Sequence, residues 1–222
     1  EAGVKRLIFT SSIAVYGGMD GVLSEERQPQ PWGELYGDLK IEAERVLQAE
    51  SQARGAPEVT ILRFPAVYGP AQNGWTRQPL QQARQNRLVV PGRGDFPLPY
   101  LSEEGMIAAV TAASVAPHCG IYNIVEGAAS YASFMGYYAA MTGARIHFTP
   151  LPLVMAFSLM NEALTRLRGG YASISRKVIR RMFSLTPETT LPVDKARREL
   201  GWQPVLTLDE GMARVSQQLQ AI

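Results

Sequence analysis

Val4-Lys-Arg-Leu-Ile-Phe-Thr10 and Val59-Thr-Ile-Leu-Arg-Phe64 are two short runs that predict strands. In the first run the apolar residues are continuous rather than alternating, which is typical of a strand buried on both faces. Between the runs, residues 35–53 have the apolar spacing of a helix, and Gly55-Ala-Pro57 ends it. Strand, helix and strand in this order predict a βαβ unit, in which the two strands are parallel and the crossover is right-handed.

Strands and helices continue to alternate along the rest of the chain, which argues for the α/β class. Ser102, Asp194 and Thr207 are expected to cap helices at their N-termini, and Gly201 to end one. We expect further strands near residues 88–90, 120–125 and 145–149, and further helices near residues 78–87, 102–115, 131–141, 151–167, 176–181 and 208–219.

The chain opens at Glu1, without a methionine and almost directly on the first predicted strand. A Rossmann-type doubly wound sheet binds the pyrophosphate of a dinucleotide at its first strand-to-helix turn, through the pattern Gly-x-Gly-x-x-Gly. The sequence has no such turn before its first predicted strand. We therefore expect only the later part of a Rossmann-type parallel sheet, with the glycine-rich N-terminal half absent, as in a fragment of a longer protein.

Tyr36-Gly-Asp-Leu-Lys40 carries the clearest chemical signal. A tyrosine and a lysine four residues apart share one face of a helix, and Ser12 follows the carboxyl end of the preceding strand. Phe64-Pro-Ala-Val-Tyr-Gly-Pro70 leaves the end of the next strand, at the same edge, where parallel sheets bind their ligands. Three segments that converge on one place favour a functional site over a solvated Tyr–Lys pair on an exposed helix.

These three side chains suit hydride transfer to or from a secondary alcohol. A free phenol titrates near ~10 and is a poor base at neutral pH, but a nearby ammonium and the positive nicotinamide of an oxidised cofactor lower its pKa. Tyr36 would then accept or supply the hydroxyl proton. Lys40 would also hold the cofactor ribose, and Ser12 would hydrogen-bond the substrate oxygen.

Composition narrows the alternatives. The 222 residues are 46% hydrophobic and carry a formal charge of +2, so they give no reason to expect a nucleic-acid partner. One cysteine, Cys119, excludes an internal disulfide and suits a reducing compartment. His118 and His147 are far apart, and we predict no metal site. No secretory signal or spanning apolar run is present, so a cytoplasmic location is expected.

The chain resembles the extended short-chain dehydrogenase/reductase superfamily, specifically the NAD-dependent epimerase/dehydratase group. The resemblance implies an NAD(P)-binding Rossmann fold, NAD or NADP as cofactor without indicating which, and a small α/β region for the substrate. It assigns catalysis to Ser12, Tyr36 and Lys40, cofactor contacts to Ser11, Tyr36, Lys40, Pro65 and Val67, and substrate contacts to Ser12, Tyr36 and Ala66. The matching segments are residues 9–17, 36–40, 62–70, 122–124 and 196–204.

The chain departs from that group in two places. Many members that act on nucleotide sugars have Asn where this chain has Ala66, and often an Arg at the stretch that matches residues 96–104, which holds none. A diphosphate normally requires such donors. The expected function is that of an oxidoreductase, epimerase or dehydratase acting on a secondary alcohol or ketone, with a sugar derivative as the preferred small-molecule substrate.

Two alternatives stay open. Residues 151–164 resemble a substrate-domain helix of 3β-hydroxysteroid dehydrogenase-like enzymes, which would act on a sterol or lipid alcohol. An apolar pocket would favour that reading, and an Arg-lined cleft would favour the nucleotide sugar.

The same helix with basic residues behind it could lie on a membrane surface, although a core helix is preferred. Without a cofactor turn, the chain could also be a non-catalytic binding module.

The resemblance also suggests a division of the chain. Residues 1–70 would be the C-terminal portion of the NAD(P)-binding domain, and residues 71–222 mainly a substrate-binding region, with segments of about 96–125 returning to the Rossmann sheet. Family members often dimerise through two long helices, and residues 35–53 match one of them. A homodimer is therefore expected for the full-length protein.

Overall fold

Three parallel strands form the central sheet, so their carboxyl ends share one edge. The computed structural model describes residues 3–170 and 175–220. The α/β class predicted from the sequence is confirmed. In spatial order the strands are β1 (Arg6–Ser12), β2 (Glu58–Phe64) and β6 (Ile121–Asn123).

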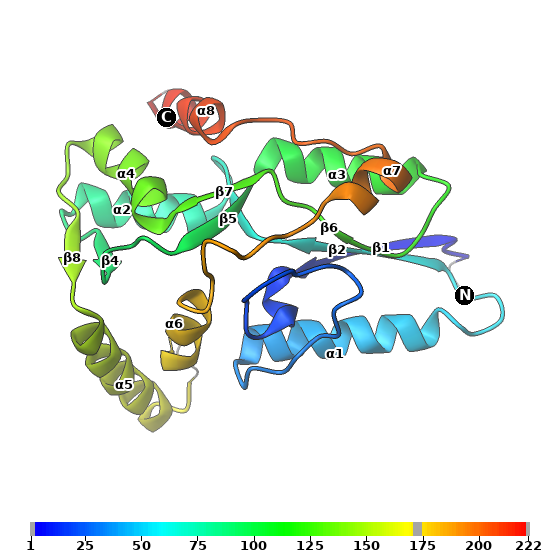
Figure 1. The fold of residues 1–222 in the computed structure, drawn as a ribbon, viewed down its shortest axis with the longest axis horizontal. Coiled ribbons are helices and arrows are strands. Elements are labelled where there is room, and N and C mark those ends of the chain that lie inside the picture. The colour runs from blue at the N-terminus through cyan, green and yellow to red at the C-terminus, as the bar shows by residue number, and fades with distance from the viewer. Residues whose placement is uncertain (1–2, 171–174, 221–222) are drawn as a thin grey trace.

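Helices cover both faces of this sheet (Figure 1). Helix α1 (Leu35–Glu50) connects β1 to β2 and packs on one face, which completes the expected βαβ unit. Helices α3 (Glu103–Val115) and α7 (Asp194–Leu200) pack on the other face. The strand register places Ser12 opposite Phe64, and Arg63 opposite Asn123.

Two smaller sheets continue the fold away from the central one. The first joins β3 to β5 in parallel and β5 to β7 in antiparallel fashion, and the second joins β4 to β8 in parallel. Their strands are β3 (Ala66–Tyr68), β5 (Pro97–Ser102), β7 (Gly127–Ser130), β4 (Val89–Pro91) and β8 (His147–Thr149).

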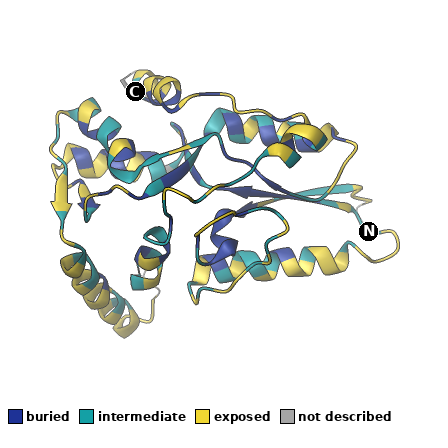
Figure 2. Ribbon diagram, in the orientation of Figure 1, coloured by how far each residue is buried: buried dark blue, intermediate teal, exposed yellow. Residues whose placement is uncertain are grey.

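The remaining helices surround these sheets. Figure 2 shows that most of β2, β5 and β6 is buried, whereas β8 and α5 are largely exposed. Trp202 is buried and its ring N–H donates to the Gly105 carbonyl at 3.1 Å, which fixes the chain after α7 against α3. These elements are η1 (Ile13–Tyr16), η2 (Asn73–Arg77), α2 (Gln78–Arg84), α4 (Tyr131–Thr142), α5 (Leu151–Leu167), α6 (Arg176–Met182) and α8 (Leu208–Gln220).

Among the residues predicted to bound helices, Ser102 and Gly201 are confirmed and Asp194 is wrong as an N-cap. The Ser102 hydroxyl accepts the Gly105 N–H at 2.9 Å, and Gly201 ends α7 with a φ of 67°. Asp194, expected as an N-cap, is instead the first helical residue after Val193. A carboxylate in the first turn still stabilises the helix dipole, so the same residue type fits either position.

The apolar stripe of α1 does not face the core, contrary to what helical spacing alone suggests. Leu39 is 59% exposed and Val46 is 42% exposed. The fully buried residues of this helix are Gly37 and Glu44. The buried positions of α1 are therefore a glycine beside η1 and α6 and a carboxylate, and the apolar stripe lies largely on the surface.

The division into residues 1–70 and 71–222 stays a prediction. Within the segment expected to return to the Rossmann sheet, β6 pairs with β2, whereas β5 pairs with β3 and β7. Across residues 3–170 and 175–220, no helix is long and apolar enough to cross a membrane.

Candidate active site

The end of β1 turns sharply into the short helix η1. Ser12 has extended backbone angles (φ −145°, ψ 149°), and its hydroxyl oxygen accepts the Ala14 N–H at 3.2 Å as the cap of η1. A hydroxyl that accepts one hydrogen bond still has its own proton to donate. The turn therefore fixes Ser12 while leaving its O–H group available.

Lys40 connects α1 to this strand end. Its ammonium donates to the Thr10 carbonyl at 2.7 Å and lies 4.7 Å from the Phe9 ring centre. Burial lowers the pKa of Lys40, and the charge of Glu44 one turn later opposes that shift. The same ammonium is 5.8 Å from the centre of the Tyr36 ring, one turn earlier. Tyr36 and Lys40 therefore share a helix face, as their spacing predicts.

Tyr36 lies in the first turn of α1, where its side chain is 52% exposed. Glu34 caps this turn by accepting the N–H groups of Tyr36 and Gly37, both at 3.0 Å. The Arg181 guanidinium, from α6, donates to the same Glu34 carboxylate at 2.7 Å. A Cβ on Gly37 would lie 3.1 Å from both Arg181 and the Ala14 carbonyl. The start of α1 is therefore closely packed against α6 and η1.

The segment after β2 forms an edge of the second sheet. Ala66 is buried opposite Tyr100, and Val67 is opposite Leu101, in the pairing of β3 with β5. Pro65 lies between β2 and β3 and is partly exposed. The substrate role of Ala66 and the cofactor roles of Pro65 and Val67 stay predictions.

Ser11 has a different environment from the one that a cofactor contact suggests. Its hydroxyl is buried and donates to the Glu44 carboxylate at 2.5 Å. The Ser11 hydroxyl therefore already donates its proton to a group within the protein. Its contact with the cofactor stays a prediction. The roles of Ser12, Tyr36 and Lys40 also stay predictions.

Sequence reasoning missed a buried polar network behind these residues. Glu44 and Arg63 form an ion pair at 2.7 Å with side chains that are each 1% exposed. Arg63 also donates to the Tyr16 hydroxyl at 3.0 Å, and that hydroxyl donates to Asn123 at 2.8 Å. Burial raises the pKa of Tyr16, so the phenol stays neutral. The spacing of Glu44, four residues after Lys40, is the signal that could have indicated it.

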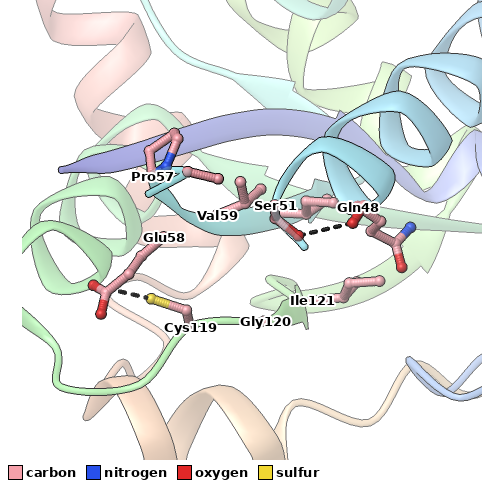
Figure 3. Close-up of a pocket in the computed structure, with 10 residues that line it drawn as sticks. Gln48, Ser51, Pro57, Glu58, Val59, Cys119, Gly120 and Ile121 are labelled. Atoms are coloured by element: carbon pink, nitrogen blue, oxygen red, sulfur yellow. Dashed lines mark hydrogen bonds between the residues drawn. The ribbon is translucent and has the colours of Figure 1, made fainter. Parts of the chain in front are cut away.

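Two pockets lie at different distances from the candidate active site: one is at the opposite edge of the central sheet, and one adjoins the start of α1. A pocket of about 320 Å³ opens at the amino ends of β2 and β6, where the Cys119 thiol lies 3.6 Å from the Glu58 carboxylate (Figure 3). It is at the opposite edge of the sheet from Ser12, so it is not the predicted site.

The other pocket, of about 330 Å³, adjoins the first turn of α1. Cationic side chains predominate among its charged residues, and we call it the basic pocket. It is lined by Gly33, Glu34, Leu35, Glu162, Arg166, Gly170, Ser175, Arg176, Lys177 and Arg180.

The fold and the site define an α/β protein with a serine, a tyrosine and a lysine near the carboxyl edge of a parallel sheet. Residues 1–124 match the NAD dependent epimerase/dehydratase family. The chain belongs to this family, which confirms the resemblance seen in the sequence.

Three similar proteins illustrate the relationship. Protein y4nG of Sinorhizobium fredii is 28% identical over 211 residues, covering 91% of this chain and 50% of the relative. The uncharacterized UDP-glucose epimerase YtcB of Bacillus subtilis is 29% identical over 138 residues, covering 61% of this chain and 43% of the relative. The structure of MoeE5 with UDP-glucuronic acid and NAD has a TM-score of 0.72 and 26% identity, covering 99% of this chain and 66% of that one. The chain thus spans about half the length of these curated relatives.

Proposed function

We propose that this chain forms the catalytic part of an NAD-dependent epimerase, dehydratase or dehydrogenase that acts on a secondary alcohol of a nucleotide sugar. The observation that carries the proposal is the 2.7 Å hydrogen bond that the Lys40 ammonium donates to the Thr10 carbonyl. This bond holds the helix face with Tyr36 and Lys40 against the strand end that carries Ser12. The three groups that the chemistry requires are therefore on adjoining segments.

Each side chain then has one role. Tyr36 accepts the proton of the substrate hydroxyl, or returns it in the reverse direction. Lys40 stabilises the phenolate of Tyr36 by its positive charge. Ser12 donates to the substrate oxygen and stabilises the negative charge that develops there.

NAD fits the donors available at this edge. An ammonium has three N–H donors, and Thr10 accepts from that of Lys40, so Lys40 can also donate to ribose hydroxyls. When bound, NAD supplies the hydride acceptor. The MoeE5 structures with NAD, and with UDP-glucuronic acid or UDP-glucose, support this choice of cofactor and of substrate class.

The basic pocket supports a nucleotide diphosphate sugar over a sterol. Arg176 already pairs with Glu162 at 3.2 Å, but cationic side chains still outnumber carboxylates in the pocket, and a diphosphate requires charged donors. The Lys177 ammonium donates to the Gly33 carbonyl at 2.7 Å, which brings α6 next to the turn before Tyr36. A polar, Arg-lined pocket at this position does not suit an apolar substrate.

The test is NAD binding and sugar conversion by the full-length protein. Calorimetric titration should show NAD binding, and incubation with UDP-glucose and NAD should give an epimerised, dehydrated or oxidised sugar visible by proton NMR. Cholesterol and other 3β-hydroxysterols serve as the competing substrates. No binding at millimolar NAD would favour the non-catalytic module, and conversion of sterol but not of UDP-glucose would favour the sterol enzyme.

A further inference from the structure

The ion pair between Glu44 and Arg63 is deeply buried, and such pairs seldom contribute much to stability. Taking both charges out of water costs several kcal/mol, and apolar residues of similar volume are often as stable. Arg63 makes two contacts with the carboxylate, at 3.1 Å and 2.7 Å. Because Arg63 holds both oxygens of the Glu44 carboxylate, this carboxylate has a fixed orientation toward the other side chains that it contacts.

The ion pair contacts the carboxyl end of β1, where the candidate active site lies. The Ser11 hydroxyl donates to Glu44 at 2.5 Å, and Ser12 is the next residue. On the other side, Arg63 reaches Tyr16 at the end of η1, and through it Asn123 at the end of β6. The network therefore joins the carboxyl ends of all three central strands to α1.

The same helix face carries the reactive groups. Tyr36, Lys40 and Glu44 follow one another at four-residue spacing, one turn apart. Lys40 bonds to Thr10 and Glu44 bonds to Ser11, so two consecutive residues of β1 are held by two consecutive turns of α1. The relative position of Ser12 and Tyr36 depends on these two attachments.

We propose that Glu44, oriented by Arg63, is a positioning residue that holds the helix face of Tyr36 and Lys40 in register with Ser12 and places a negative charge one turn from the Lys40 ammonium. This inference rests on the function proposed above. Around Lys40 lie the rings of Phe9 and Tyr36, the Thr10 carbonyl and, one turn later, Glu44. Because Glu44 opposes the effect of burial on the pKa of Lys40, its charge favours the ammonium form.

The first test follows Lys40 directly and needs no catalytic activity. The chain has four lysines, so the Cε signal of Lys40 can be assigned by substitution and titrated by ¹³C NMR. Glu44→Gln should shift the Lys40 titration to lower pH than in the wild type. Glu42→Gln is the matched control, because Glu42 pairs with Arg45 on the exposed side of the same helix, and it should leave that titration unchanged. An identical Lys40 titration in wild type and Glu44→Gln would overturn the proposal.

The second test separates positioning from simple structural support. Replacing the pair by Glu44→Leu with Arg63→Met should keep the fold, as judged by circular dichroism and melting, since apolar replacements of buried pairs are tolerated. In the full-length enzyme kcat should nevertheless fall on the order of tenfold to a hundredfold, with KM little changed, because the groups are misplaced. A folded double variant with wild-type kcat would refute positioning. If the wild type turns over no substrate, the proposed function fails, while the Lys40 titration still tests the coupling to Glu44.

Discussion

At the scale of single residues, Lys40 experiences two opposing effects. Partial burial lowers the pKa of its ammonium, and Glu44 counteracts that effect. The carbonyl of Thr10 and the face of the Phe9 ring both stabilise the charged form. These contacts favour the ammonium form of Lys40, which is held 5.8 Å from the centre of the Tyr36 ring, close enough to influence the phenol.

Lys40→Ala should therefore reduce both turnover and NAD affinity. The variant removes the charge that stabilises the Tyr36 phenolate and the N–H donors that can reach ribose hydroxyls. Turnover should fall by about 10²–10⁴-fold, the usual contribution of acid–base catalysis. Steady-state kinetics and NAD calorimetry on the full-length protein measure the two effects. Lys195→Ala, at a lysine outside the site, should change neither, and an unchanged NAD affinity in Lys40→Ala would contradict the assignment.

Gly17 follows η1 and is required by the turn there. Its φ is 68°, and a Cβ would approach the Gln30 carbonyl oxygen to 2.5 Å. Gly17→Ala should destabilise the protein by more than about 1 kcal/mol, because the backbone is left-handed and space is lacking. Gly136→Ala, in α4 with open space around it, should instead stabilise by about 0.5–1 kcal/mol. Urea unfolding measures both, and equal effects would show that the turn is not constrained.

At the residue level, geometry could be predicted where spacing determines it, whereas the roles of the side chains stay predictions. Tyr36 and Lys40 could be found because their four-residue spacing determines a shared face, and the structure shows that face. The spacing of Glu44 from Lys40 places it on the same helix face, but that spacing alone does not show that its carboxylate is buried against Ser11, because Glu44 resembles a solvated helix residue in the sequence. Only the register of β1 and β2, which sets Ser11 opposite Arg63, explains why a carboxylate is buried there.

At the scale of elements, helices were easier to predict than short strands. The boundaries of α1, α3 and α5 lie close to those expected from capping residues and apolar spacing. Strands β3, β5 and β7 were not predicted. Pro97 and Pro99 in β5 remove backbone donors and obscure the pattern, and β7 consists of small residues with no alternation. Pairing between distant segments determines these strands.

The attachment of α1 to β2 predicts a large effect on stability. Arg63→Ala would leave the Glu44 carboxylate buried without its cation, at a cost of about 3–5 kcal/mol. Arg45→Ala removes the partner of an exposed pair on the same helix and should have a small effect, since exposed pairs contribute little. Chemical denaturation with a circular dichroism signal compares them. Similar midpoints for the two variants would mean that the buried pair does not connect helix and sheet.

At the scale of the whole molecule, one face of the βαβ unit remains apolar. Leu39 and Val46 of α1 are exposed, and an open apolar groove of α1 and β1 lies beside them, lined by Leu7, Phe9, Leu39, Glu42, Ala43, Val46 and Leu47. The expected homodimer would bury this stripe. A contiguous exposed apolar patch on a protein often marks an interaction site.

The homodimer predicts a simple result for surface variants. Leu39→Glu combined with Val46→Glu places charges in the apolar stripe and should convert a dimer of the full-length protein to a monomer. Analytical ultracentrifugation measures the mass, and melting temperature controls for folding. Arg45→Glu, at an exposed residue of the same helix that does not line the groove, should keep the dimer. A wild-type protein that sediments as a monomer would contradict the prediction.

The fold class and the family could be predicted from the sequence because they depend on local patterns that recur along the chain. The division of the chain into residues 1–70 and 71–222 stays a prediction, because it depends on pairings between distant segments. The segment from Ala66 to Ser130 contributes strands to all three sheets, and pairings such as β2 with β6 depend on residues that are about sixty positions apart. No local pattern encodes such a pairing.

The central claim is that the Tyr36 hydroxyl carries the substrate proton. Tyr36→Phe removes this oxygen alone and keeps the ring, so folding and NAD affinity should change little. With UDP-glucose and NAD, kcat of the full-length protein should fall by about 10²–10⁴-fold. Single-turnover and steady-state rates of the variant and the wild type measure this difference directly. Wild-type turnover in a folded Tyr36→Phe protein would contradict the account.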